Sequence, residues 1–143
     1  MAEPPDASAP PPEPLMLFDG MCNFCSGSAL FVLRRSRGRR LRFCAMQTPR
    51  GEAVLRRLGL PLSDYVTVVL VENGAVRVKS AAVLGLAAHM DAPWPFLARL
   101  LRCVPRRMRD WVYDRIAANR FRIAGRRAHC IVPDAETRQR FLL

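Results

Sequence analysis

The stretch Leu15–Cys25, with the sequence LMLFDGMCNFC, decides how the rest of the chain folds. Its first four residues are apolar and predict a short buried strand, which a turn at Asp19 ends. Cys22 and Cys25 then open an apolar run that continues to Leu33 and predicts a helix. The spacing of that run places both sulfurs on or near one helical face.

Cys22 is expected at the first turn of this helix, where unpaired backbone N–H groups and the helix dipole stabilise a thiolate. A lowered thiol pKa would make Cys22 reactive near neutral pH. Cys25, one turn further along, can then attack a mixed disulfide that forms on Cys22. A strand, a tight turn, Cys-x-x-Cys and a helix in this order are typical of a thioredoxin-like redox site.

Asp19 is the third candidate catalytic residue, and two interpretations of it stand side by side. As a buried carboxylate, it could take and return the proton of Cys25. As the residue of an Asp-Gly turn, it could simply accept hydrogen bonds from backbone N–H groups near the helix start.

The composition fits one globular domain: the chain has 143 residues, and half of them are hydrophobic. Residues 1–14 are rich in Pro and Ala, lack the pattern of a signal peptide, and are expected to form a flexible tail. A reducing cytoplasm is therefore the expected compartment, and Cys-x-x-Cys there is more often catalytic or metal-binding than structural. The net charge of +11 comes almost entirely from arginine. Without a nucleic-acid motif, we expect no specific nucleic-acid partner.

The rest of the chain continues the α/β pattern. A second strand is expected over 41–46, a helix from Thr48-Pro49 to about Gly59, and a strongly β-branched strand over 65–71. Asn73-Gly74 predicts a hairpin, after which Ser80 is expected to cap a helix. The order predicts a thioredoxin-like mixed sheet flanked by helices, with a single domain over 15–133 and a C-terminal tail over 134–143.

A helical C-terminal extension is expected from about residue 92. An amphipathic segment lies between Pro93 and Pro105. A longer helix is expected from Pro105 to about Phe121, and Gly125 is expected to end this helical region. Apolar residues at helical spacing predict the face that packs inward: these are Met108, Trp111, Val112, Ile116 and Ala117. The last dozen residues are expected to form a surface tail that packs back through Phe141.

Asp19-Gly20-Met21-Cys22-Asn23-Phe24-Cys25 resembles the Asp-Gly-x-Cys-x-x-Cys signature of the DCC family of predicted thiol-disulfide oxidoreductases. Further matching positions are Ser80, Ala82, Pro105, Asp110, Tyr113, Asp114, Ala117, Asn119, Arg120, Gly125, Arg126 and Cys130. The resemblance spans about residues 15–133. It implies a small cytoplasmic bacterial or plastid protein with a thioredoxin-like core, and a thiol–disulfide oxidoreductase whose redox group is its own disulfide rather than a bound cofactor. Ordinary thioredoxins carry a cis-proline just before the third strand, whereas Asp64-Tyr65 stands there in this chain, so we expect a narrower thiol or disulfide substrate, either protein or small molecule.

Two alternatives to an exchange enzyme remain open. Cys22, Cys25, His129 and Cys130 could hold zinc or an iron–sulfur cluster, although a second Cys-x-x-Cys or a spaced His pair is missing. The arginine-rich segment from Pro93 to Arg109 could instead lie on a membrane surface or a partner, although packing onto the sheet is the simpler expectation.

Three further cysteines lie outside the Cys-x-x-Cys pair. Cys44 and Cys103 are expected to be small buried hydrophobes, while Cys130 could be a third redox thiol. A group on the last helix could form a polar patch at the site or a network that anchors the helix: Tyr113, Asp114, Asn119 and Arg120.

Overall fold

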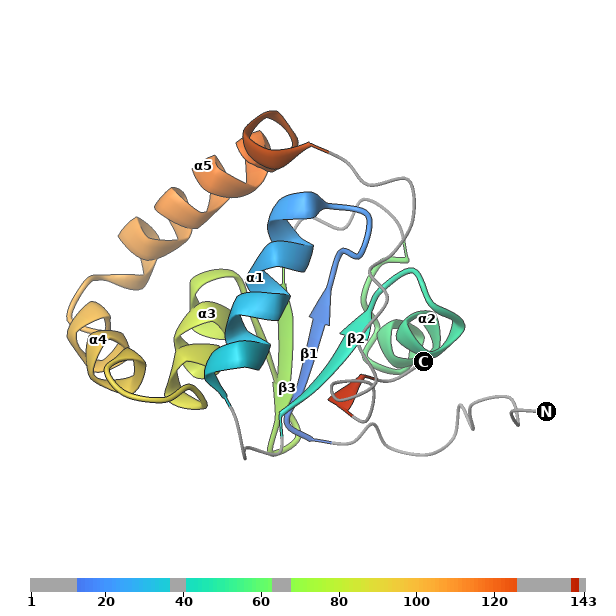
Figure 1. Cartoon of the computed structure of the whole chain (residues 1–143), viewed down its shortest axis with the longest axis horizontal. Coiled ribbons are helices and arrows are strands. Elements are labelled where there is room, and N and C mark those ends of the chain that lie inside the picture. Colours follow the sequence, from blue (N-terminus) through green and yellow to red (C-terminus); the bar gives the residue numbers. More distant parts are fainter. Residues whose placement is uncertain (1–12, 37–40, 63–67, 126–139, 142–143) are drawn as a thin grey trace.

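The computed structural model of the chain describes residues 13–36, 41–62, 68–125 and 140–141. The order of elements confirms the predicted α/β class with a helical C-terminal extension (Figure 1). The elements are β1 (Leu15–Phe18), α1 (Asn23–Arg35), β2 (Arg42–Ala45), α2 (Pro49–Arg57), β3 (Val69–Glu72), β4 (Ala75–Val78), α3 (Lys79–Ala88), α4 (Trp94–Leu101) and α5 (Arg106–Ala124).

The strands form one mixed sheet in the order β2-β1-β3-β4. β1 pairs parallel with β2 and antiparallel with β3, and β4 returns antiparallel to β3. Asn73 and Gly74 make the predicted hairpin turn, with φ angles of 53° and 75°. Residues 63–67, which carry the first part of the predicted third strand, lie outside the described residues. The element order and these pairings are consistent with a thioredoxin-like fold.

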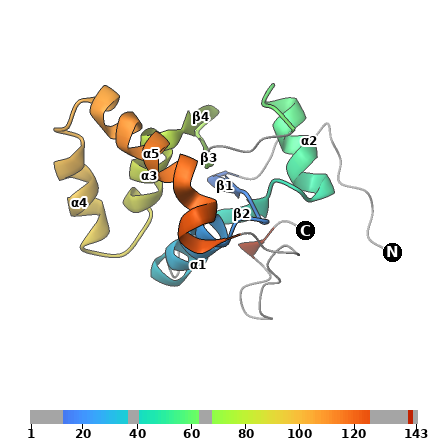
Figure 2. The ribbon, with the colours of Figure 1, turned by 90° about the horizontal axis from the view of Figure 1, so that it is seen from above.

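Side chains alternate across β1 and so build two cores, one on each face of the sheet. Met16 and Phe18 face α1 and α3, whereas Leu15 and Leu17 face α2. Figure 2 shows the strands between these helices. Because β1 is buried on both faces, its sequence is a continuous apolar run rather than an alternating one.

Phe141 packs back onto the first core, as the sequence predicts. Its ring lies edge-on to Phe18, with 6.3 Å between ring centroids, and 5.6 Å from the ring of Phe43. The backbone of Phe141 also forms a parallel bridge with Phe43, at the open side of β2.

The start of α2 follows the prediction, and the start of α3 does not. Thr48 Oγ1 accepts a hydrogen bond from Gly51 N at 3.1 Å, so Thr48 caps α2. The predicted capping role of Ser80 is wrong, because α3 begins at Lys79 and Val78 occupies the cap position. The Ser80 hydroxyl and backbone N–H instead donate to the carboxylate of Asp110 on α5.

The predicted inward face of α5 is also wrong. Met108 and Trp111 are 61% and 60% exposed, and Val112 and Ile116 are exposed as well, whereas Ala117 is half-buried. The apolar residues of α4 are likewise exposed, and its inward positions are Ala98 and the half-buried Trp94, whose ring meets Phe31 edge-on. α4 packs mainly on α3, and α5 packs on α1 and α3. The expectation that the segment from Pro93 to Arg109 packs onto the sheet is therefore wrong, because helices lie between it and the strands.

Among the described residues, no helix has both the length and the apolar character that crossing a bilayer requires.

Candidate active site

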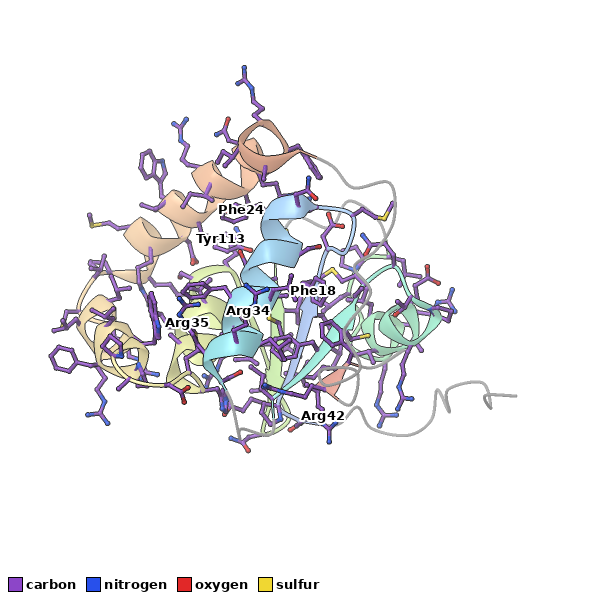
Figure 3. The ribbon with its side chains drawn as sticks, in the orientation of Figure 1. Phe18, Phe24, Arg34, Arg35, Arg42 and Tyr113 are labelled. Atoms are coloured by element: carbon purple, nitrogen blue, oxygen red, sulfur yellow. The ribbon has the colours of Figure 1, made fainter. Side chains whose placement is uncertain are left out.

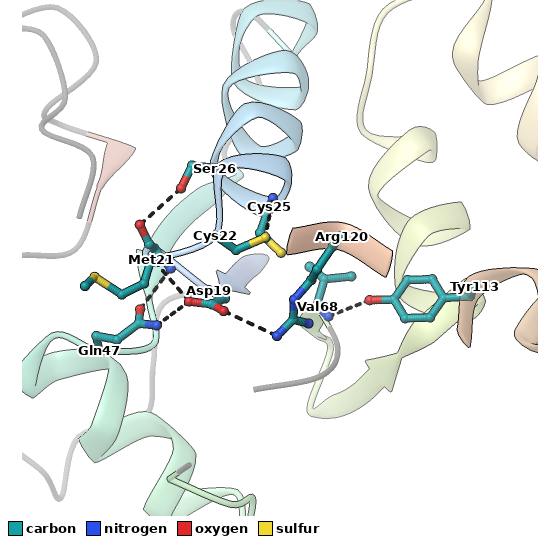
Figure 4. Close-up of polar contacts among 10 residues, drawn as sticks. Asp19, Met21, Cys22, Cys25, Ser26, Gln47, Val68, Tyr113 and Arg120 are labelled. Carbon is teal, nitrogen blue, oxygen red and sulfur yellow. Dashed lines mark hydrogen bonds and ion pairs between the residues drawn. The ribbon is translucent and has the colours of Figure 1, made fainter. Parts of the chain in front are cut away.

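The two cysteines lie where the sequence places them, at the start of α1. Cys22 is the N-cap residue, and its Sγ accepts a hydrogen bond from the backbone N–H of Cys25 at 3.3 Å (Figure 4). The bond forms because a cap side chain meets the N–H three residues on. Ser26 reinforces this turn by donating its hydroxyl to Gly20 O at 3.3 Å. Both cysteines are free thiols in the structure.

The two sulfurs differ in their surroundings. Cys22 is fully buried, and Cys25 is half-buried in the first turn of the helix. Burial, the hydrogen bond with Cys22 and the charge of an ionised Cys22 together raise the pKa of Cys25 to about 12, and Asp19 adds to this effect. The Arg120 guanidinium acts in the opposite direction. Cys25 therefore keeps its proton at neutral pH, including when Cys22 is ionised.

Asp19 is held by three donors in a buried position between β1 and α1. Its Oδ1 accepts from Met21 N at 3.0 Å and from the side-chain amide of Gln47. Its Oδ2 lies 3.4 Å from Nη2 of Arg120. The predicted turn role is therefore present, and Arg120 also holds the carboxylate in position near the cysteines (Figure 4).

The C-terminal end of α5 lies over the start of α1. The Asn23 backbone N–H donates to Gly125 O at 3.2 Å, and its side-chain amide donates to Ala124 O at 2.8 Å. Gly125 ends α5 with a φ of 80°, as predicted for a C-terminal glycine. These bonds bring Arg120, one turn before the end of α5, to Asp19.

Four polar residues of α5 are predicted either to join the site or to form a network that anchors the helix, and the structure shows examples of both. Arg120 joins the site, and Tyr113 accepts a hydrogen bond from the Val68 backbone N–H at 2.8 Å, directly before β3. The other two residues lie apart from the site: Asp114 pairs with Lys79 at 3.1 Å, and the Asn119 amide donates to Arg115 O. Tyr113 and Asp114 thus anchor the helix.

Gln47 was not singled out from the sequence. It follows β2, and it links both sides of the turn because its Oε1 accepts from Gly20 N at 2.9 Å while its amide donates to Asp19. A single glutamine carries no motif, so only the pairing of β1 with β2 brings it to this turn.

The structure describes only some of the other predicted ligands and thiols. His129 and Cys130, proposed to complete a metal site, lie outside the described residues. Among the residues that the structure covers, no group of three or more His, Cys, Asp or Glu side chains is arranged to hold a metal ion. Cys44 is buried as predicted, and burial raises its pKa. Cys103 is exposed after α4, which contradicts its predicted burial.

Comparison with known proteins agrees with this geometry. Residues 16–126 match the family model of the DCC1-like thiol-disulfide oxidoreductases. The uncharacterized protein YuxK of Bacillus subtilis is 34% identical over 92% of this chain and 95% of its own length. A chloroplastic DCC family protein of Arabidopsis thaliana is 43% identical over 82% of this chain and 68% of its own. No solved structure matches the chain significantly.

Proposed function

Because the chain belongs to the DCC1-like thiol-disulfide oxidoreductase family, we propose that Cys22 and Cys25 exchange a disulfide with a thiol or disulfide substrate. The observation that carries the proposal is the pairing of the two sulfurs at the start of α1, where Cys25 N–H donates to Cys22 Sγ. The nucleophile in such an exchange is a cysteine thiolate, and the second sulfur must lie close enough to form the disulfide that ends the reaction.

In the reducing direction, the Cys22 thiolate attacks one sulfur of a substrate disulfide and releases the other as a thiolate. The mixed disulfide on Cys22 is then attacked by Cys25, which loses its proton as it reacts. The second substrate thiolate leaves, and a Cys22–Cys25 disulfide remains. Two electrons pass from the dithiol to the substrate, and the two protons end on the released thiols; a cellular thiol or dithiol restores the pair.

The assignment of roles to the two cysteines follows from their surroundings. A Cys25 pKa of about 12 leaves this thiol protonated while Cys22 attacks. Cys25 therefore fits the role of the resolving thiol. It needs a base to accept its proton when it attacks the mixed disulfide. Asp19 is proposed to take that proton, since its charge acts on Cys25 and Arg120 fixes its carboxylate.

The redox group in this proposal is the disulfide itself, with no bound cofactor, and the expected setting is a reducing, cytoplasm-like compartment. Cys22 is fully buried, and the end of α5 is bonded to the neighbouring Asn23, so we propose that a substrate gains access to the sulfur when this end of α5 moves. Such a step would favour a narrow substrate class over general protein disulfides.

Trapping of a mixed disulfide tests the proposal. The Cys25→Ser variant should accumulate a mixed disulfide with glutathione on Cys22 when treated with oxidised glutathione, as found by peptide mass spectrometry. The Cys22→Ser variant should not trap one on Cys25, and Cys103→Ser serves as the matched control at an exposed thiol outside the site. Equal trapping on Cys25 in Cys22→Ser would overturn the assignment of the attacking sulfur.

A further inference from the structure

The orientation of α5 is the reverse of that of an ordinary amphipathic helix. Its polar residues point into the protein: Asp110 holds Ser80, Tyr113 meets Val68 N, and Arg120 pairs with Asp19. Its apolar residues Met108, Trp111, Val112 and Ile116 follow at helical spacing on the opposite side, and all are exposed. Polar contacts thus hold α5 in place, and its apolar stripe takes no part in the described core.

The preceding helix α4 also exposes apolar side chains. Phe96 is 63% exposed, and Leu97, Leu100 and Leu101 are exposed beside it. Figure 3 shows the side chains of α4 and α5 extending outward, on the side away from the sheet. Scattered apolar residues are normal on a surface, but most of the exposed large hydrophobic side chains of the described chain belong to these two helices.

The same two helices also carry many exposed arginines. The exposed ones on α4, on α5 and between them are Arg99, Arg102, Arg106, Arg107, Arg115 and Arg122. The acidic side chains of the two helices are both engaged: Asp110 by Ser80 and Arg106, and Asp114 by Lys79. The guanidinium of Arg115 lies over the Trp111 ring, 5.0 Å from its centroid, so charge and aromatic surface are presented together.

We propose that the outward faces of α4 and α5 dock on the surface of a bilayer that contains anionic phospholipid. Apolar and aromatic side chains bordered by arginine match an interface in which acyl chains lie beneath negative headgroups. Charge complementarity argues against a second copy of the chain, because two such positive faces would repel each other. The inference does not depend on the redox chemistry, since its exposed residues include none of those placed at the candidate active site.

Vesicle binding by the full chain tests the proposal. Co-sedimentation is expected with vesicles of phosphatidylcholine mixed with phosphatidylglycerol, and not with phosphatidylcholine alone, and added salt should weaken it. Trp111→Ser should lower the partition coefficient about tenfold. Arg107→Gln should lower it about fivefold. Val83→Ser on α3 and Arg56→Gln on α2 are matched controls at exposed positions of other helices, and neither should alter binding.

Fluorescence gives a second, local measurement. The chain has two tryptophans, and Trp94→Phe leaves Trp111 as the single emitter. Its emission should shift to shorter wavelength with the anionic vesicles and stay unchanged with phosphatidylcholine. Three results would overturn the proposal: no shift and no sedimentation at low salt, equal loss of binding in Val83→Ser, or a protein-concentration-dependent shift without vesicles, which would indicate self-association or a protein partner's site.

Discussion

Arg120 Nη2 lies 3.4 Å from Asp19 Oδ2, and this ion pair joins the last helix of the described chain to the turn before Cys22 and Cys25. Both residues are only 7% exposed. A charge that loses its partner in such a place is costly, because neither water nor another ion replaces the contact.

Removing one member of the pair should therefore destabilise the fold. Arg120→Met leaves the Asp19 carboxylate buried without its ion pair, and the free energy of unfolding should fall by about 3–5 kcal/mol in urea titrations. The double variant Asp19→Asn/Arg120→Met should recover part of that loss, because the unpaired charge is gone. Additive losses in the double variant would show that the two side chains act independently. Arg106→Met, whose partner Asp110 also bonds Ser80 near the surface, should change stability little.

Asp19 should also control the acidity of Cys25. Its negative charge raises the pKa of Cys25, so Asp19→Asn should lower that pKa. The measurement is thiolate absorbance against pH, comparing Cys22→Ser with Cys22→Ser/Asp19→Asn so that Cys22 does not contribute. Glu52→Gln on α2 is the matched control for losing an acidic side chain elsewhere. An unchanged titration in a folded Asp19→Asn chain would remove Asp19 from the electrostatics of the site.

The raised pKa of Cys25 has a consequence for stability at high pH. The unfolded chain releases this proton near 9.0 and the folded chain near 12, so between those values the folded state holds more protons. Raising the pH then favours unfolding, and the contribution that is complete below pH 9 is lost by about pH 12. Thermal unfolding of the reduced protein should show this loss. Cys25→Ser should lose less stability over the same range, and identical pH profiles would contradict the shift.

Access to Cys22 should depend on the contact between Asn23 and the end of α5. Asn23→Ala removes the side-chain bond to Ala124 O, so the alkylation rate of Cys22 by iodoacetamide should rise severalfold. Ser28→Ala, which removes an exposed bond to Phe24 O within α1, is the matched control and should leave the rate unchanged. Rates are measured by peptide mass spectrometry. An equal rate in Asn23→Ala would mean that α5 does not limit access to the sulfur.

The sequence predicts most clearly what local patterns determine. The apolar run of β1, the cap position of Cys22 and the turn at Asn73-Gly74 each follow from a few neighbouring residues. Contacts between distant segments leave no such pattern. Gln47 lies 28 residues from Asp19 and Arg120 lies 101 residues from it, so only the assembled sheet and the placement of α5 bring them together.

The prediction of which face of α5 packs inward was wrong for a related reason. Helical periodicity shows that Met108, Trp111, Val112 and Ile116 share a face, but it does not say what that face meets. The inward side is decided by Asp110 and Arg120, which have partners on α3 and in the turn after β1. Ser80 illustrates the same limit. Its hydroxyl donates to Asp110 on α5 and does not cap α3.

We expect Cys22 and Cys25 to form a reversible disulfide. The most direct measurement is peptide mass spectrometry of the full chain after equilibration across glutathione redox buffers, with metal content determined on the same sample. We predict a Cys22–Cys25 disulfide with a single two-electron midpoint, with Cys44 remaining a free thiol. A pair that stays reduced across the range, or is shielded from alkylation by a stoichiometric metal until chelation, would contradict the account.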